Sequence, residues 1–300
     1  MNDSSSADAG LAQVDDEFLR RWPLPQPDAK GDKEDRGRVL IIAGSREMPG
    51  ALILAANASL HAGAGKVTVA TAASVARLVA AALPEVRVVE LPETAAGGTD
   101  RHAFECVREL LSRVDAVLIG PGMQDETATC ALCSDVIRHL STSVLVLDAA
   151  AMDVVDQTPG IMKFSGPTVL TPHAGELAHL TGRRKDEVTA RPAESAANAA
   201  RQWNAVVALK GAVTFIAAPA GALWRHQGGN VGLAVSGSGD VLAGVIAGLA
   251  ARGATAEQAA VWGVALHARS GDRLAARAGP LGYLARDLSA EVPALMRALA

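Results

Sequence analysis

The chain has 300 residues, of which 49% are hydrophobic, 20% are charged and only 3% are aromatic, a composition typical of a globular protein with a mainly aliphatic core. The formal net charge of −4, with no run rich in lysine and arginine, argues against nucleic acid as a partner. An anionic ligand would need a local binding site, since the overall charge does not attract it.

The N-terminal part of the chain carries little pattern. Residues 1 to 15 are polar and acidic and are expected to be a disordered extension, and residues 23–37 are expected to form a loop. No basic segment followed by an apolar run marks a signal peptide, and no apolar run reaches the ~18 residues that a membrane span requires. We therefore expect a cytoplasmic protein without a membrane partner.

From residue 38 onwards, strands and helices alternate. Continuous Val, Ile and Leu runs predict strands, and helical periodicity between them predicts helices. The expected strands are 38–44, 66–71, 85–91, 116–120, 143–149 and 168–172, and the expected helices are 50–63, 74–83, 102–113, about 125–140, a short one ending at Gly182, and 191–204. Closely spaced runs at 205–211, 213–219 and 222–227 are expected to add a strand pair at one edge, before helices at 240–252, 255–278 and about 283–299.

This alternation predicts the fold class. Strands without polar alternation are typical of a parallel sheet that is covered on both faces. No linker or change of composition divides the chain after residue 37. We therefore expect residues 16–300 to form a single α/β domain of three layers, with a mostly parallel central sheet and an antiparallel edge.

The three cysteines, Cys106, Cys130 and Cys133, do not suggest a disulfide framework, and they favour a reducing compartment. Cys130 and Cys133 form a C-x-x-C pair within an expected helix, but no second pair completes a zinc site. They are interpreted as structural thiols, and no protein metal site is predicted.

Glycine-rich loops follow several strands, at the edge where parallel sheets bind ligands. Residues 44–51, GSREMPGA, open a helix but lack the Gly-Lys-Ser/Thr ending of a Walker motif. Residues 63–68, GAGKVT, lead into a strand and not a helix, and residues 120–122, GPG, force a turn. None of these loops specifies a ligand by itself.

A stronger signal is Gly-Ser-Gly-Asp at 237–240. Gly237 and Gly239 allow backbone N–H groups to point into one concavity at the start of a helix, where the helix dipole favours negative charge. The following run, 241–250, is apolar all round and should be buried. Asp240 is therefore either an ordinary N-cap or a general base beside an anion-binding site, and the residues alone leave both open.

Two further segments could belong to a site. His173 follows a strand and Pro172, where it could bind a ligand or pack against its own turn. Lys210-Gly211 joins two strands, in a bend that could embrace a ligand or form a plain hairpin. No role is assigned to the remaining histidines, His61, His102, His139, His179, His226 and His267.

Taken together and in order, these segments resemble the ADP/ATP-dependent NAD(P)H-hydrate dehydratase family, a branch of the ribokinase-like superfamily. The resemblance covers essentially residues 31–300, and the combination of PHxGE, KGxxT and GSGDVLxG is specific to the family. The matching segments are GRVLIIAGS with Gly50-Ala51, IGPG at 119–122, VLDA within 145–149, LTPHAGE at 170–176, LKGAVT at 209–214, GN at 229–230 with Gly232, GSGDVLAGVIAG from 237, and GYLARDL at 282–288.

The resemblance implies an activity and a set of site residues. The family restores NADH or NADPH that has been hydrated at the C5–C6 bond of the nicotinamide ring, and its bacterial members consume ADP and release AMP and phosphate. Asp240 would be the general base, with the N–H groups of Gly237, Ser238 and Gly239 as the anion hole. The hydrate-binding positions would be Ala51, Gly122, His173 and Asp240, and the nucleotide-binding positions Lys210, Gly211, Ala212, Val213, Thr214 and Gly239.

Two positions depart from the family pattern. The usual GPGLG reads Gly120-Pro121-Gly122-Met123-Gln124, which leaves the contact near Gly122 open. The usual DADA(L/I) reads Asp148-Ala149-Ala150-Ala151-Met152, without its second aspartate. Because this removes a carboxylate from the floor of the site, Asp148 is not named as a catalytic residue.

The resemblance also implies partners. Mg²⁺ would be carried by the nucleotide phosphates, a homotetramer is expected, and a separate chain would supply the epimerase, because the segment before residue 38 is too short for one. A small-molecule kinase acting on a vitamin-precursor hydroxyl is the alternative, since the same aspartate and anion hole serve both reactions. A nucleotide sensor without turnover is a third interpretation, which the intact GSGD disfavours.

Overall fold

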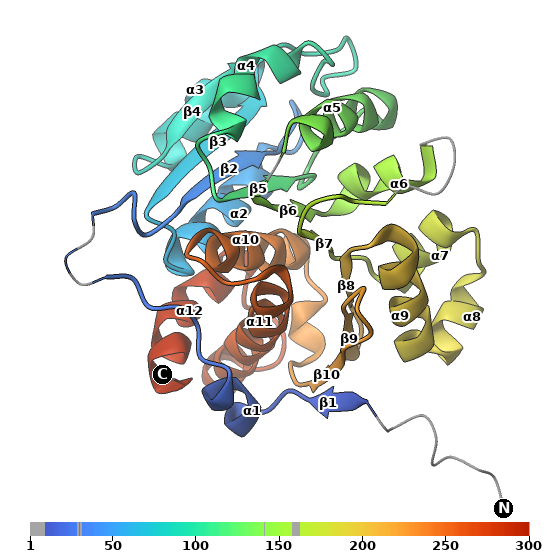
Figure 1. The fold of residues 1–300 in the computed structure, drawn as a ribbon. Helices are drawn as coiled ribbons and strands as arrows, with labels where there is room; N and C mark the ends of the chain where they lie inside the picture. The colour runs from blue at the N-terminus through green and yellow to red at the C-terminus, as the bar shows by residue number, and fades with distance from the viewer. Residues whose placement is uncertain (1–9, 29, 31, 141, 158–162, 300) are drawn as a thin grey trace, which may run out of the picture.

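Figure 1 shows the chain as a computed structural model, which describes residues 10–28, 30, 32–140, 142–157 and 163–299. Its centre is a ten-stranded sheet with the strand order β1-β10-β9-β8-β7-β6-β5-β2-β3-β4. The strands are β1 (Leu11–Gln13), β2 (Arg38–Ile42), β3 (Lys66–Ala72), β4 (Arg87–Leu91), β5 (Ala116–Ile119), β6 (Val144–Leu147), β7 (Thr168–Leu170), β8 (Val206–Leu209), β9 (Val213–Ala217) and β10 (Leu223–Gln227).

Helices connect these strands and cover the sheet. The α-helices are α1 (Asp16–Arg21), α2 (Pro49–His61), α3 (Ala73–Ala82), α4 (Ala103–Leu111), α5 (Glu126–His139), α6 (Val154–Gln157), α7 (Ala174–Thr181), α8 (Lys185–Ala190), α9 (Pro192–Trp203), α10 (Ser238–Ala251), α11 (Ala256–Ala278) and α12 (Ala285–Leu299). The described residues also form two short 3-10 helices, η1 (Ala149–Asp153) and η2 (Val231–Leu233).

The sheet is mixed, as expected from the strand spacing. Every neighbouring pair from β4 across to β8 is parallel, whereas β9 runs antiparallel to both β8 and β10. The β8–β9 turn spans only Lys210 to Ala212, which is why its two strands pair directly. The predicted antiparallel edge is therefore confirmed.

Both faces of the sheet are buried. In β2, Val39 and Ile41 face the cluster formed with α2, α10, α11 and α12, whereas Leu40 and Ile42 face the cluster formed with α4, α5, α7 and α9. This division follows from the period-two alternation of side chains along a strand. The predicted three-layer α/β/α architecture is confirmed (Figure 1).

Helix α10 lies within the core, as its uniformly apolar sequence predicts. Every residue from Val241 to Ala251 is buried. A Cβ atom at Gly244 would lie 2.3 Å from the Ala55 carbonyl oxygen of α2, so glycine is what permits this close approach. Ser59 of α2 also donates a hydrogen bond to the Gly244 carbonyl, at 2.8 Å. Close packing against α2 therefore fixes the start of α10.

The N-terminal extension differs from the prediction. Leu11–Gln13, expected to be disordered, form β1 and pair in parallel with β10, while residues 1–9 lie outside the described residues. The residues after β1 also pack against the rest of the protein. Val14 is buried, and Trp22 stacks on Trp224, with ring centroids 5.8 Å apart. The partners lie about 200 residues away in sequence, so no local pattern could reveal them.

The C-x-x-C pair is buried in α5, as expected for structural thiols. Burial raises the pKa of Cys130 to about 12 and moves the pKa of Cys133 in the same direction. Neither thiol forms a disulfide. Since a thiol must ionise to react or to bind a metal, this burial disfavours both for Cys130 and Cys133.

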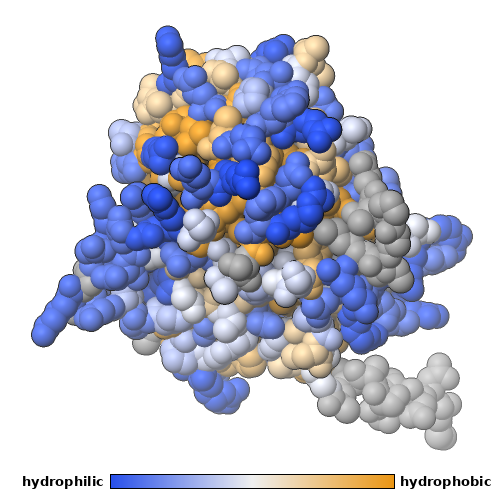
Figure 2. All heavy atoms as spheres, turned by 45° about the horizontal axis from the view of Figure 1, so that its top comes forward, coloured by the Kyte–Doolittle hydropathy of each residue, from blue (hydrophilic) through white to orange (hydrophobic). Residues whose placement is uncertain are grey.

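The surface is mixed in character. Figure 2 shows hydrophilic side chains spread over the face turned towards the viewer, with smaller hydrophobic areas between them. The large hydrophobic residues that remain exposed include Met48, Val231 and Leu281. Among the helices of the described residues, none is both long and apolar enough to cross a bilayer.

Candidate active site

The candidate site lies where five parallel strands end. Strands β2, β5, β6, β7 and β8 share one direction, so the loops that follow them meet at one edge of the sheet. Backbone hydrogen bonds join these loops: the Gly44 N–H donates to the Pro121 carbonyl at 2.7 Å, and the Lys210 N–H donates to the Pro172 carbonyl at 2.8 Å. The loops after β2, β5, β6, β7 and β8 therefore form a rim at this edge. Of the glycine-rich loops singled out in the sequence, 44–51 and 120–122 belong to it, whereas 63–68 precedes β3 and lies at the other edge of the sheet.

Helix α10 begins at this rim. Gly237 is its N-cap, in the left-handed region with φ +88°, and Asp240 is the third residue of the helix. Asp240 is therefore not the N-cap, which removes the capping alternative. The Ser238 N–H already donates to the Val235 carbonyl at 3.2 Å, whereas the N–H groups of Gly237, Gly239 and Asp240 have no acceptor among the described residues. Of the three predicted anion-hole residues, Gly237 and Gly239 therefore keep an N–H open to an anion, and Ser238 does not.

Ser238 is held from the neighbouring helix by His267, to which sequence reasoning gave no role. The Nε2 atom of His267, in α11, lies 3.0 Å from both the hydroxyl and the carbonyl oxygen of Ser238. Burial lowers the pKa of His267 to about 4, so its neutral ring can donate to these oxygens. Nothing in the spacing of residues 256–278 could have pointed to this contact.

Four charged side chains meet beside α10. The Lys210 ammonium lies 3.3 Å from Asp148 Oδ1 and 3.8 Å from Glu176 Oε2. Asp148 Oδ1 also accepts a hydrogen bond from the Thr171 hydroxyl at 2.6 Å. Burial by itself lowers the pKa of Lys210, but Asp148, Glu176 and Asp240 outweigh it and keep the pKa above its ordinary value. Lys210 is therefore a fixed positive charge.

Asp240 is a carboxylate with raised basicity. Burial, together with repulsion from Asp148, raises its pKa to about 6, although Lys210 acts in the opposite direction. No hydrogen-bond donor among the described residues reaches the Asp240 side chain. A half-buried carboxylate of this kind is largely ionised at neutral pH, yet it is a stronger base than an ordinary aspartate.

The expected nucleotide-binding residues lie at the start of α10 and in the β8–β9 turn with the first residues of β9. A Cβ atom at Gly239 would lie 3.6 Å from the Lys210 ammonium, which places these two residues side by side. Gly211 and Ala212 are exposed at the tip of the β8–β9 turn, and Val213 and Thr214 open β9. The tip of this turn is therefore reachable from solvent, and Lys210 at its start lies beside the first turn of α10.

Ala51 and Gly122, two of the expected hydrate-binding residues, are in direct contact. Gly122 has φ +66°, and a Cβ atom there would lie 2.7 Å from the Ala51 Cβ and 2.7 Å from the Met48 carbonyl oxygen. A side chain at position 122 would therefore fill the space beside Ala51. Ala51 lies on α2 and Asp240 lies on α10, and these two helices pack against each other.

His173 caps its own helix. Its Nδ1 atom accepts from the N–H groups of Gly175 and Glu176, both at 3.0 Å, while the Glu176 carboxylate accepts from the His173 N–H at 2.7 Å. This is the packing against its own turn that the sequence left open. The side chain is nevertheless 60% exposed, and its Nε2 lies 3.6 Å from Glu176 Oε1, so a ligand at this nitrogen would meet the Glu176 carboxylate as well.

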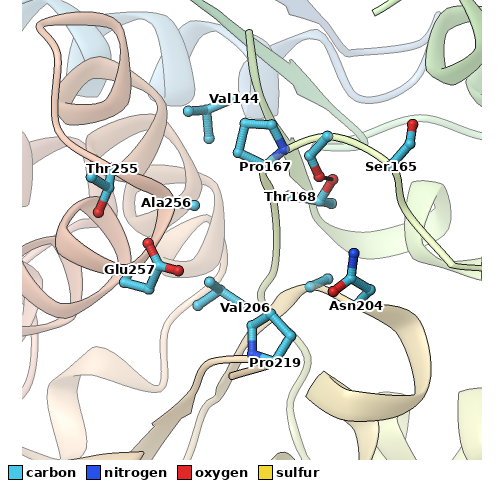
Figure 3. Close-up of a pocket in the computed structure, with 12 residues that line it drawn as sticks. Val144, Ser165, Pro167, Thr168, Asn204, Val206, Pro219, Thr255, Ala256 and Glu257 are labelled. Atoms are coloured by element: carbon cyan, nitrogen blue, oxygen red, sulfur yellow. Dashed lines mark hydrogen bonds between the residues drawn. The ribbon is translucent and has the colours of Figure 1, made fainter. Parts of the chain in front are cut away.

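Two cavities bear on the location of the site. One of about 380 Å³ lies between residues 149–153 and 173–180, and His173 and Glu176 line it. A larger one, of about 440 Å³, lies at the other edge of the sheet, where Val144, Thr168 and Val206 line it (Figure 3). Val144, Thr168 and Val206 are the first residues of β6, β7 and β8, so this cavity lies at the amino ends of these strands. None of the predicted site residues lines it.

Potential metal ligands gather at one place among the described residues. Atoms of Glu126, Asp153 and His179 lie within 4.8 Å of one another. Glu126 and His179 are exposed, and carboxylates commonly gather at a surface without an ion. This group includes none of the predicted site residues and does not take part in the Lys210 cluster.

Comparison with known proteins agrees with this geometry. A solved structure of an ADP/ATP-dependent NAD(P)H-hydrate dehydratase from Bacillus subtilis, co-crystallised with ATP and Mg²⁺, superposes with a TM-score of 0.82 at 29% identity and covers 98% of this chain and 100% of its own. An ADP-dependent (S)-NAD(P)H-hydrate dehydratase of Xanthomonas campestris pv. campestris is 49% identical over 278 residues, 93% of each chain.

A longer relative is also similar. The bifunctional NAD(P)H-hydrate repair enzyme of Moorella thermoacetica is 40% identical over 280 residues, and the chain spans 53% of its length. The sequence model described as NAD(P)H-hydrate dehydratase matches residues 39–294. The match of this model to most of the chain and the 49% identity to the Xanthomonas campestris enzyme show that the chain belongs to the NAD(P)H-hydrate dehydratase family.

Proposed function

We propose that this chain is an ADP-dependent hydro-lyase that converts the S-epimer of hydrated NADH or NADPH to NADH or NADPH, with release of AMP and phosphate. The observation that carries the proposal is the environment of Asp240. Its carboxylate has a pKa of about 6, the unpaired N–H groups of Gly239 and Asp240 lie at the same helix start, and the Lys210 ammonium faces them. A base, an anion hole and a fixed cation thus adjoin one another.

The first step is phosphoryl transfer. Asp240 takes the proton of the C6 hydroxyl group, and the hydroxyl oxygen forms a bond to the terminal phosphorus of ADP while the bond to the AMP oxygen breaks. Negative charge on the transferred phosphoryl group is stabilised by the N–H groups of Gly239 and Asp240 and by Lys210. The products of this step are AMP and a phosphorylated hydrate.

The second step is elimination. The bond from C6 to the phosphate oxygen breaks, a proton passes from C5 to the departing phosphate or to water, and the C5–C6 double bond of the nicotinamide ring returns. Phosphate is a much better leaving group than hydroxide, which is why the reaction consumes a nucleotide. Asp240 lies in the first turn of α10, whose dipole favours the departing anion.

The two substrates occupy adjoining sides of the rim. Ala51, Gly122, His173 and Asp240 bind the hydrate, with the absent side chain at Gly122 leaving room beside Ala51. The nucleotide lies along the β8–β9 turn, with its phosphates towards Gly239. Mg²⁺ is carried by the nucleotide phosphates, a proposal supported by the ATP and Mg²⁺ used with the Bacillus subtilis relative.

The partners follow from the same proposal. An epimerase on another chain supplies the S-epimer, in keeping with the bifunctional relatives that are about twice as long as the matched region. The homotetramer and the cytoplasmic location remain predictions.

The test is an incubation of hydrated NADH with ADP or with ATP, following the recovery of absorbance at 340 nm and the release of phosphate. We expect recovery with both nucleotides and faster recovery with ADP. Recovery that is clearly faster with ATP would overturn the donor while leaving the reaction class intact. Accumulation of a stable phosphorylated product without recovery would instead support the kinase alternative, which no observation in the structure favours.

A further inference from the structure

We propose that Asp148 is a positioning residue for this reaction: its buried carboxylate holds the Lys210 ammonium in place and keeps it from pairing with Asp240. The inference rests on the proposed function, in which Asp148 itself has no part. It agrees with the sequence argument that Asp148 is not a catalytic residue, and it gives Asp148 a role that the sequence did not suggest.

The contacts of Asp148 favour this role. Its side chain is almost completely buried, with the whole residue 3% exposed. Oδ1 accepts from the Thr171 hydroxyl at 2.6 Å and from the Lys210 ammonium at 3.3 Å. The hydroxyl group fixes the carboxylate, and the carboxylate in turn fixes the ammonium, because a charged acceptor orients its donors strongly. Lys210 is thereby held within reach of Gly239.

The backbone next to Asp148 is strained. Ala149 has φ +49°, a conformation that residues other than glycine rarely adopt. Gly120 has φ +128°, and a Cβ atom there would lie 1.7 Å from the Asp148 carbonyl oxygen. Strained backbone persists where the surroundings over-determine it, and it gathers at functional sites. A buried ion pair that only stabilised the fold would not need this strain, since apolar residues serve stability equally well.

The charges around Lys210 explain what its position controls. Asp148 after β6, Glu176 on α7 and Asp240 on α10 all attract this ammonium, and His267 on α11 stays neutral. Repulsion from Asp148 raises the pKa of Asp240, whereas Lys210 lowers it. Without the Asp148 charge, the pKa of Asp240 would fall for two reasons. The repulsion from Asp148 would be lost, and Lys210 would be free to move towards Asp240. The base would become weaker and the phosphate would lose its cation.

Asp148→Asn tests this role, because asparagine keeps the shape and its Oδ1 can still accept from Thr171. We expect the acidic limb of the profile of kcat/KM against pH, which reports the free enzyme and lies near pH 6 in the parent, to move down by about one pH unit. We also expect kcat at pH 7.5 to fall about tenfold and the KM for ADP to rise several-fold. Rates are the ADP-dependent part of the recovery at 340 nm, since NADH decomposes in acid.

Matched variants separate positioning from a structural role. Thr171→Val keeps the Asp148 charge, so it should lower kcat less and leave the limb in place. Asp156→Asn removes an exposed charge from the same segment and should leave both kcat and the limb unchanged. A fall in melting temperature for Asp148→Asn, with an unmoved limb and an unchanged KM for ADP, would show that Asp148 is purely structural.

A readout without turnover keeps this inference separate from the proposed function. The carboxyl carbon of Asp240 is titrated by ¹³C NMR in the parent and in Asp148→Asn, with Asp240→Asn used to assign the resonance. We expect its titration midpoint to fall in Asp148→Asn even if the parent shows no ADP-dependent recovery, a result that would overturn the function alone. An unchanged midpoint overturns the role of Asp148, whatever the activity.

Discussion

Replacing Asp240 by asparagine is expected to stabilise the unliganded protein at pH 8. Burial and Asp148 raise the pKa of Asp240 from 3.8 to about 6. The folded protein therefore binds this proton more tightly than the unfolded chain does, and its stability falls as the pH rises from about 4 through about 6. Asparagine has the size of the neutral carboxylic acid and does not ionise, so it avoids this loss.

The expected magnitude follows from the pKa shift. About two pKa units correspond to about 3 kcal/mol, at 1.36 kcal/mol per unit. The carboxylate is only half-buried, so water solvates part of its charge, and we expect about half of that value, or about 1–2 kcal/mol. For a chain of this size the gain is about 2–3 °C in melting temperature.

Thermal unfolding of both proteins, followed by circular dichroism without nucleotide from pH 4 to pH 8, measures this difference. The asparagine variant should melt higher at pH 8, and the two curves should converge near pH 4. If Asp240 instead stabilised α10 through its dipole, the variant would be less stable at pH 8 by about 0.3–1 kcal/mol. That result would refute the reasoning.

Three further substitutions probe the rim and the packing beneath it. Gly120→Ala places a Cβ atom 1.7 Å from the Asp148 carbonyl oxygen and should cost about 3 kcal/mol or more in chemical denaturation; an unchanged midpoint would contradict the geometry. Gly244→Ala, 2.3 Å from the Ala55 carbonyl, should cost about 1–3 kcal/mol and lower kcat by shifting α10, so full activity and stability would argue against the close packing. Gly211→Val should raise the KM for ADP several-fold and leave that for the hydrate unchanged; the reverse pattern would exchange the two binding sites.

Much of the fold could be predicted because its signals are local. Runs such as RVLII at 38–42 and VLVL at 144–147 specify buried strands by themselves. Helix α10 could be recognised as buried because it lacks a polar face. Strand β1 could not be predicted, since three residues become a strand only by pairing with Leu223–Arg225 at the far end of the sequence.

The site could be predicted in part, for a similar reason. Asp240 and Lys210 stand in short motifs whose glycines and loops carry a local signal. The motifs could not show that Asp240 occupies the third position of the helix and not its N-cap, because this depends on where Gly237 turns. The contact of His267 with Ser238 spans 29 residues and two helices, and no pattern of spacing encodes it.

The role of Asp148 was concealed by the sequence for another reason. The missing second aspartate of its motif suggested a weakened site, but the importance of Asp148 depends on Thr171 and Lys210, which follow two other strands. These three residues meet only because β6, β7 and β8 lie side by side in parallel. Side chains that are brought together by sheet order require the structure to be recognised.

The most direct test of the account is the kcat of Asp240→Asn with hydrated NADH and ADP, measured by recovery of absorbance at 340 nm on a preparation shown to be folded and to bind ADP. A general base should be worth roughly 10²–10⁴ in rate. The account predicts a loss of that size with ADP binding retained, since the substitution also relieves repulsion between a carboxylate and the phosphates. Turnover within a few-fold of the parent enzyme would contradict it.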